Sequence, residues 1–148
     1  MQIVPGSARN KTAIQDMILP NFLMIGAAKS GTSAIYRQLR HHPDVFMSHI
    51  KEPSFFALQG HDLYFAGPGD MDALGACAVN NLDDYSRLFE AGREAAVVGE
   101  ASNIYLYSPA APRAIKEMLP NVKMIAVLRD PVERAFSAYL MMLRDGRE

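Results

Sequence analysis

The sequence predicts an α/β fold in which a central parallel sheet is flanked by helices in three layers. Three observations predict it: four short apolar runs, helical segments that alternate with them, and a composition ordinary for a globular chain. The 148 residues are 49% hydrophobic and 21% charged, which suits one domain with a core of useful size. Alternating strands and helices favour parallel pairing with right-handed crossovers.

Four apolar runs are predicted to form the strands of this sheet. Each is short and is bounded by Gly, Pro, Asp or Asn, which is typical of buried parallel strands. The runs span residues 22–27, 44–47, 96–100 and 123–128. Because parallel strands share one direction, their carboxyl ends are expected to meet at one edge, where ligands bind in open α/β sheets.

Helices are predicted between and after the strands. Ser108 followed by Pro109 is a typical helix start, with serine as the N-cap and proline first in the helix. Asp130 and Glu133 have the spacing of a capping box, and the apolar residues that follow recur on one helical face. A long loop is predicted over residues 57–81, which are rich in Gly, Asp and Pro. The predicted helices span residues 32–42, 83–91, 109–119 and 131–143.

Composition argues against several classes of function. The net charge of -1 gives no field that favours nucleic acid, and no apolar run approaches the ~18–20 residues of a membrane span. The single cysteine, Cys77, excludes an internal disulfide and fits a reducing compartment, so a cytoplasmic location is expected. No motif surrounds Cys77, which is interpreted as an ordinary residue rather than a nucleophile. The four histidines form no zinc pattern, so no metal is expected.

We predict two parts of the chain: a lead-in segment, residues 1–19, and one folded domain, residues 20–148. The lead-in lacks the long apolar centre of a secretory signal. The sequence stops within a few residues of the last predicted helix, with no closing element. We interpret this ending as a C-terminal truncation of the domain.

A phosphate-binding loop is predicted where the first strand meets the first helix. Residues 26–33 read GAAKSGTS, and the two glycines allow a tight turn and the close approach of an anion. The helix start attracts phosphate through its unpaired N–H groups and its dipole, Lys29 adds a positive charge, and Thr32 and Ser33 add hydroxyl donors. Lys29 precedes Gly31, whereas the lysine of the common ATP and GTP loop follows the glycine, which disfavours an ATPase. A plain strand-to-helix turn with an incidental lysine is the alternative.

A second anion anchor is predicted after the fourth strand. That strand delivers Arg129 to the carboxyl edge of the sheet, and Ser137 lies two turns into the next helix, on the face where the helix begins. Arginine is a bidentate donor to phosphate, so Arg129 and Ser137 are expected to share one anion. The alternative is that Arg129 pairs with Asp130 or Glu133. Two anchors at one edge suit a ligand with phosphates at two separate places.

Three segments in this order resemble the PAPS-dependent sulfotransferases, where PAPS is 3′-phosphoadenosine 5′-phosphosulfate. They read PNFLMIGAAKSGTSAIYRQLRHHPDV, KEPSFF and GEASNIYLYSPAAPRAIKEMLPNVKMIAVLRDPVERAFSAYL. The resemblance covers about residues 20–144 and is nearest to the heparan sulfate N- and O-sulfotransferase domains and their bacterial relatives. It implies a P-loop-like form of the three-layer α/β fold.

The resemblance also implies a donor, a reaction and the residues that serve them. PAPS is the implied donor, and its sulfo group is passed without metal to a hydroxyl or amine of a carbohydrate-like or small-molecule acceptor. Lys29 stabilises the leaving bisphosphate in this scheme. The residues implied to hold the 5′-phosphosulfate are Lys29, Ser30, Gly31, Thr32 and Ser33, and those implied to hold the 3′-phosphate are Arg129 and Ser137.

Glu52 is the candidate general base. It precedes Phe55 and Phe56, where a carboxylate would be partly desolvated, as suits a base. The resemblance implies that the glutamate of KEPSFF removes the acceptor proton. The alternative is a surface glutamate paired with Lys51.

Two other functions stay open on the sequence alone. One is a kinase-like phosphotransferase that uses ATP and magnesium, although the loop lacks the spacing for it. The other is a non-catalytic fragment that binds a nucleotide. Magnesium dependence separates the first from a sulfotransferase, and donor binding without turnover marks the second.

Overall fold

The computed structural model describes residues 17–63, 67, 71 and 75–146, and its centre is a four-stranded parallel sheet. The strands lie in the order β2-β3-β1-β4, so β1 pairs with β3 and β4, while β2 pairs with β3. All four predicted strands are confirmed, with ends that differ by one or two residues. Their bounds are β1 Phe22–Gly26, β2 Val45–Met47, β3 Val97–Ala101 and β4 Lys123–Ala126.

Helices follow the strands as predicted, and two short elements were not predicted. The unpredicted elements are α3 and the 3-10 helix η3, which follow β2 and β3 and are too short to show a helical period in the sequence. Among the helices that the structure describes, none is both long and apolar enough to cross a membrane. The helices are α2 Thr32–Arg40, α3 Phe55–Leu58, α4 Leu82–Arg87, α5 Ala111–Met118 and α6 Pro131–Arg144, with 3-10 helices η2 Glu90–Gly92 and η3 Asn103–Leu106.

Of the two predicted N-cap residues, Ser108 and Asp130, one is correct. Oδ1 of Asp130 accepts hydrogen bonds from the N–H groups of Val132 and Glu133, both at 3.0 Å, so Asp130 caps α6 as predicted. The predicted start of α5 is wrong by two residues. The helix begins at Ala111, and the hydroxyl of Ser108 accepts the Ala111 N–H at 3.3 Å from outside the helix.

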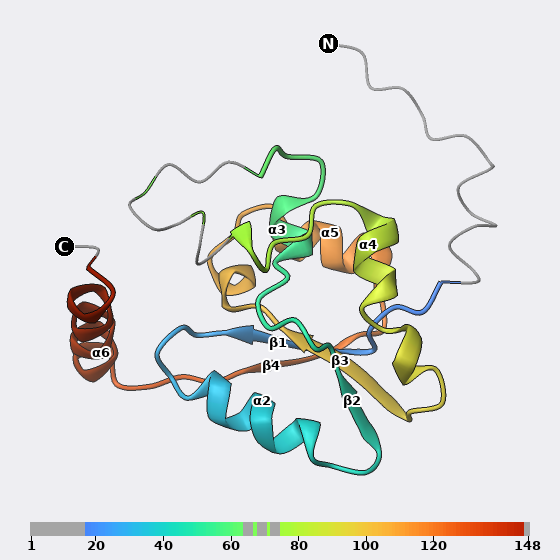
Figure 1. Cartoon of the computed structure of the whole chain (residues 1–148), viewed down its shortest axis with the longest axis horizontal. Coiled ribbons are helices and arrows are strands. Elements are labelled where there is room, and N and C mark those ends of the chain that lie inside the picture. Colours follow the sequence, from blue (N-terminus) through green and yellow to red (C-terminus); the bar gives the residue numbers. More distant parts are fainter. Residues whose placement is uncertain (1–16, 64–66, 68–70, 72–74, 147–148) are drawn as a thin grey trace.

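The helices cover the sheet on both faces, which makes three layers (Figure 1). Helix α2 lies on one face, while α3, α4 and α5 lie on the other. Alternate residues of β1 therefore enter different cores: Leu23 packs toward α3, α4 and α5, and its neighbours pack toward α2. The core beside α2 contains Phe22, Met24, Tyr36, Met47 and Ala101, and the larger core is built around the aromatic residues Phe55, Phe56, Tyr85, Phe89 and Tyr105.

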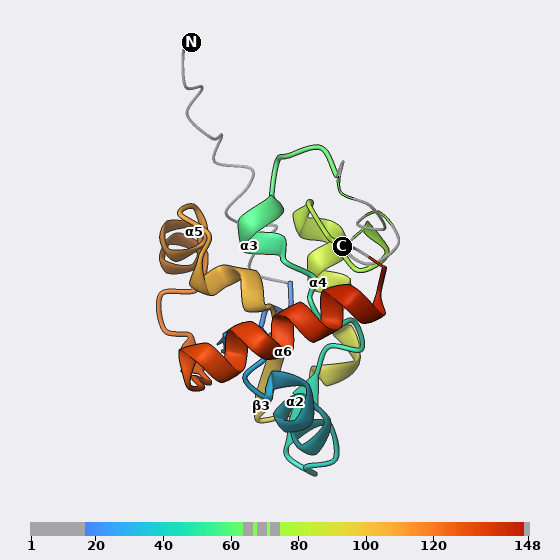
Figure 2. The ribbon, with the colours of Figure 1, turned by 90° about the vertical axis from the view of Figure 1, so that its left-hand side faces the viewer.

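Strand β4 and helix α6 are exposed, contrary to the predicted burial of residues 123–128. β4 is an edge strand paired only with β1, and every residue of β4 is exposed. Helix α6 stands beyond the carboxyl ends of the strands, and Figure 2 shows it crossing that side of the molecule. No residue of α6 is buried among those described. Exposed apolar side chains on these elements and on the connection between them are Met124, Ile125, Leu128, Val132, Phe136, Tyr139, Leu140 and Leu143.

Two predicted segments lie partly outside the described residues. Residues 1–16 of the lead-in are among these, as are positions 64–66, 68–70 and 72–74 of the predicted loop. The first two residues of that loop belong to α3. Cys77, in the described part of the loop, is half-buried and carries a free thiol.

Candidate active site

The loop between β1 and α2 forms an open turn at the carboxyl edge of the sheet. Gly31 caps α2 with φ 98°, a conformation in which glycine is strongly preferred, and a Cβ added there would meet no atom within 4 Å. No side chain caps this helix end, and its first turn carries no acidic residue. Space, N–H groups and the helix dipole are thus all available to an anion.

A pocket of about 750 Å³ opens in front of this loop, within the usual size range of small-molecule sites. Three chain segments that each follow a strand contribute to its walls. The loop and α2 provide Lys29, Gly31, Thr32, Ser33 and Arg37; the segment after β2 provides Lys51, Glu52 and Ser54; and the segment after β3 provides Asn103, Ile104 and Tyr107. Met141 of α6 and its C-cap residue Asp145 complete the lining.

Positive charges exceed negative charges in the lining of the pocket. Lys29, Arg37 and Lys51 line it, together with the carboxylates Glu52 and Asp145. Arg37 lies one helical turn after Ser33, and its Nε donates a hydrogen bond to the Ser33 carbonyl at 3.2 Å. Such a lining suits a ligand with several negative charges.

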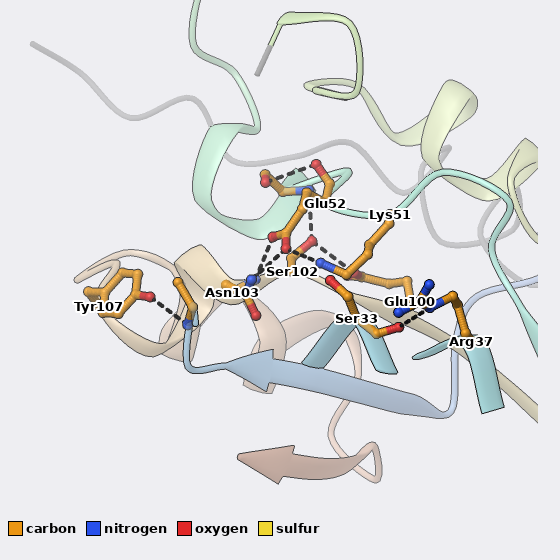
Figure 3. Close-up of polar contacts among 10 residues, drawn as sticks. Ser33, Arg37, Lys51, Glu52, Glu100, Ser102, Asn103 and Tyr107 are labelled. Carbon is orange, nitrogen blue, oxygen red and sulfur yellow. Dashed lines mark hydrogen bonds and ion pairs between the residues drawn. The ribbon is translucent and has the colours of Figure 1, made fainter. Parts of the chain in front are cut away.

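Glu52 is held by three donors inside this pocket, as Figure 3 shows. Nζ of Lys51 lies 2.6 Å from Oε1, the side-chain amide of Asn103 donates to the same oxygen at 2.6 Å, and the Asn103 backbone N–H donates to Oε2 at 2.7 Å. The pairing of Glu52 with Lys51, which was the alternative considered from the sequence, is therefore present, and Glu52 also lines the pocket. Phe55 and Phe56 lie in the core of the protein and anchor the segment that carries Glu52.

A second carboxyl group, Glu100, lies behind the pocket and is fully buried. Its Oε1 accepts the hydroxyl of Tyr85 at 3.2 Å, and its Oε2 accepts the hydroxyl of Ser102 at 2.8 Å. Burial raises the pKa of Glu100 to about 7, although hydrogen bonds from Tyr105, Ser102 and Tyr85 oppose the rise. Burial and the nearby Glu100 also raise the pKa of Tyr85 and of Tyr105, so both hydroxyls remain protonated donors.

Most residues predicted for the donor loop meet at the pocket. Lys29, Gly31, Thr32 and Ser33 line it together with Glu52, although Lys29 and Glu52 are 23 positions apart in the chain (52 − 29). The hydroxyl of Ser30 is buried and has no hydrogen-bond partner among the described residues.

The predicted second anchor is not part of this pocket. Nε of Arg129 pairs with Oε2 of Glu133 at 3.1 Å, which is the alternative pairing considered from the sequence. Nη1 of Arg129 also lies 3.5 Å from the carbonyl oxygen of Lys29, so the arginine does reach the loop between β1 and α2. Ser137 is half-buried on α6. A shared anion between Arg129 and Ser137 stays a prediction.

The sequence interpretation missed six polar residues of the pocket: Arg37, Lys51, Ser54, Asn103, Tyr107 and Asp145. Arg37 was accessible to sequence reasoning, because the four-residue spacing from Ser33 places both on one helical face. Asn103 and Tyr107 depend on the adjacency of β3 and β1, which local patterns do not give. The Tyr107 hydroxyl accepts the backbone N–H of Ala28 at 3.1 Å and so contacts the phosphate loop directly.

A parallel sheet flanked by helices, with a glycine-containing loop between the interior strand β1 and helix α2, defines an α/β protein. A model of the sulfotransferase family matches residues 20–148, and the chain belongs to this family. This result confirms the family resemblance found in the sequence.

Known proteins with similar sequence and structure support the assignment. A crystal structure of a sulfotransferase from Alicyclobacillus acidocaldarius matches with a TM-score of 0.82 and 41% identity, over 88% of this chain and 53% of that one. The human heparan sulfate glucosamine 3-O-sulfotransferase 6 is 32% identical over 84% of this chain and 31% of its own length. The membrane-associated sulfotransferase kil1 of Dictyostelium discoideum is 32% identical over 83% of this chain and 23% of its own. The chain thus spans about half of the solved structure and less than a third of these relatives.

Proposed function

We propose that this chain carries the donor site and the base of a sulfotransferase that uses PAPS and sulfates a hydroxyl or amine of a carbohydrate-like acceptor. One observation carries the proposal: Lys29 and the start of α2 face the same pocket as Glu52. An anion site and a carboxylate in one pocket are what transfer of a sulfo group to a nucleophile requires. The relatives named above include an enzyme of heparan sulfate, which suggests the acceptor class.

The pocket fits a donor of this kind. Its volume of about 750 Å³ accommodates a nucleotide, and the empty space beside Gly31 allows an anionic group to approach the backbone. Lys29 and the N–H groups of α2 would hold the 5′-phosphosulfate. We place the 3′-phosphate near Arg129 and Ser137, on the strength of the contact between Arg129 and Lys29.

PAPS supplies an activated sulfo group. The residues of this chain supply the general base and the groups that stabilise the leaving bisphosphate. Glu52 accepts the proton of the acceptor hydroxyl or amine, whose oxygen or nitrogen then forms a bond to sulfur. The bond between sulfur and the bridging phosphate oxygen breaks in line, and its electron pair stays on the leaving bisphosphate. Lys29 and the α2 N–H groups neutralise the charge that develops on that oxygen. No covalent intermediate with the protein is needed.

Calorimetric titration with 3′-phosphoadenosine 5′-phosphate, with ADP as the control, tests the donor assignment. The bisphosphate is expected to bind at least about tenfold more tightly than ADP, because ADP lacks the 3′-phosphate, and a charge-assisted contact to that group contributes about 1.5–3 kcal/mol. Equal affinities would contradict the two-anchor assignment. A second assay then follows ³⁵S from labelled PAPS into glycan acceptors; binding without transfer would identify a non-catalytic donor-binding unit.

A further inference from the structure

Both oxygens of the Glu52 carboxylate are held by a single residue. Asn103 donates its backbone N–H to Oε2 at 2.7 Å and its side-chain amide to Oε1 at 2.6 Å. The two residues are 51 positions apart, and they meet because the segments after β2 and β3 lie side by side in front of the loop. Two donors on two oxygens fix both the position and the plane of a carboxylate, as one contact cannot.

The backbone that carries Glu52 is unusual, and neighbouring residues hold it in place. Among the described residues, those other than glycine with positive φ are Lys29, Glu52 and Ser54, at 66°, 67° and 59°, and all three line the pocket. Such conformations persist where surrounding contacts enforce them, and they cluster at functional sites. Here the N–H of Glu52 donates to the Ala101 carbonyl at 2.8 Å, and the N–H of Ser54 donates to the Ser102 hydroxyl at 2.9 Å.

The contact with Glu52 leaves another atom of Asn103 without a partner. Oδ1 of Asn103 is buried and accepts no hydrogen bond from the described residues. Turning the amide over would place this oxygen against Oε1 of Glu52, so the carboxylate dictates the orientation. A buried acceptor without a partner costs folding free energy. The amide is thus arranged around Glu52 at the expense of its own hydrogen bonding.

Lys51 also contacts Glu52, but it does not fix a direction. Its ammonium group is a compact charge on a flexible four-carbon stem, and its side chain remains 24% exposed. The lysine therefore balances the charge of the carboxylate, whereas the short side chain and rigid backbone of Asn103 orient it.

We propose that Asn103 is the positioning residue of the base: it aims the Glu52 carboxylate at the acceptor group in the pocket. The proposal rests on the proposed function, in which Glu52 takes the acceptor proton. A misplacement of about 1 Å in a reacting group can lower a rate about a hundredfold. Asn103 is therefore expected to affect the chemical step and not the binding of the donor.

The test compares Asn103→Leu, which removes the amide at similar size, with Asn103→Asp, which keeps the shape but presents oxygen to the carboxylate. Asn21→Leu is the control, because the Asn21 side chain also bonds β3, to Ala96 and Val98, at the opposite edge of the sheet. The readouts are kcat and KM for the acceptor and the Kd of 3′-phosphoadenosine 5′-phosphate.

We expect Asn103→Leu to lower kcat about ten- to a hundredfold while the Kd of the bisphosphate stays within about twofold. Asn103→Asp should lower kcat at least as much, since it places a second carboxylate against Glu52. Asn21→Leu should keep kcat. The proposal is overturned if Asn103→Leu keeps wild-type kcat, if Asn103→Asp does so, or if kcat and donor affinity fall together.

A protein that transfers no sulfo group would refute the proposed function but would still allow the contact to be tested. Side-chain amide resonances of Asn103 in ¹⁵N-labelled protein should then move on Glu52→Gln substitution by more than those of Asn21. Resonances of Asn103 that move no more than those of Asn21 would overturn the positioning role.

Discussion

The hydroxyl of Ser102 donates a hydrogen bond to Oε2 of the buried Glu100 at 2.8 Å. The same hydroxyl accepts the backbone N–H of Ser54 at 2.9 Å, two residues after the candidate base. The protonation of Glu100 is thereby linked, through one serine, to the segment that carries Glu52. Because burial raises the pKa of Glu100 to about 7, Glu100 gains or loses its proton within the physiological pH range.

The pH dependence of stability follows from this carboxyl group. Below about pH 4.5 Glu100 is protonated in both the folded and the unfolded chain. Between pH 4.5 and about 7 the unfolded chain loses the proton and the folded one keeps it, so the free energy of unfolding falls as pH rises and then levels off. Relative to Glu100→Gln, the wild type is expected to lose roughly 3 kcal/mol across this window. Urea unfolding at several pH values measures this loss of the free energy of unfolding. The control is Glu94→Gln, which replaces an exposed carboxylate.

Lys29→Ala should weaken binding of 3′-phosphoadenosine 5′-phosphate about ten- to a hundredfold, since it removes a charge-assisted contact to phosphate. Lys116→Ala, on the exposed face of α5, removes the same charge away from the pocket and should leave the Kd unchanged. Titration calorimetry of both variants gives the comparison. Equal Kd values for the two would argue against the loop as the donor site.

Glu52→Gln should keep donor binding and lower kcat about a hundred- to ten-thousandfold, the usual contribution of a general base. Glutamine preserves the size of the side chain but accepts no proton from the acceptor. Glu117→Gln, an exposed carboxylate paired with Arg113, is the matched control and should retain full activity. Turnover of Glu52→Gln near the wild-type rate would place the base elsewhere.

Two phenylalanines should differ sharply in their contribution to stability. Phe89 is fully buried with its ring 5.1 Å from that of Tyr85, so Phe89→Ala should lower the free energy of unfolding by about 3–5 kcal/mol. Phe136 on α6 is 60% exposed, and Phe136→Ala should change it by no more than about 0.5 kcal/mol. Denaturant unfolding of both variants distinguishes the sites, and a large loss for Phe136→Ala would mean that α6 is packed in solution.

The sheet and its helices were predictable because their signals are local. Buried strands show as apolar runs, and the cap of α6 at Asp130 follows from one residue type at one position. Burial of β4 was predicted wrongly, since an apolar run does not say whether its strand lies at the centre or the edge of a sheet. Met124 of β4 illustrates this, because it is 54% exposed.

The site was predictable only in part, because local sequence patterns do not reveal contacts between segments that are distant in the chain. Lys29 and Glu52 stand in recognisable short segments, so the sequence marked both. Asn103 lies within the third matched segment, but nothing in the sequence marked it, because its importance comes from a contact with a residue 51 positions away. Glu100 was placed correctly on a strand, but its complete burial and its partner Tyr85 depend on packing between elements.

The Tyr107 hydroxyl accepts a hydrogen bond from the N–H of Ala28, which makes Tyr107 an intrinsic fluorescent probe of ligand binding at the loop. The chain contains no tryptophan, so tyrosine emission is not masked, and Tyr107 is 54% exposed at the rim of the pocket. An anion that settles on the loop changes the surroundings of this ring, while Tyr85 and Tyr105 stay buried in the core. Tyrosine fluorescence should therefore report ligand arrival in the unlabelled protein, and Tyr107→Phe should lose most of the signal.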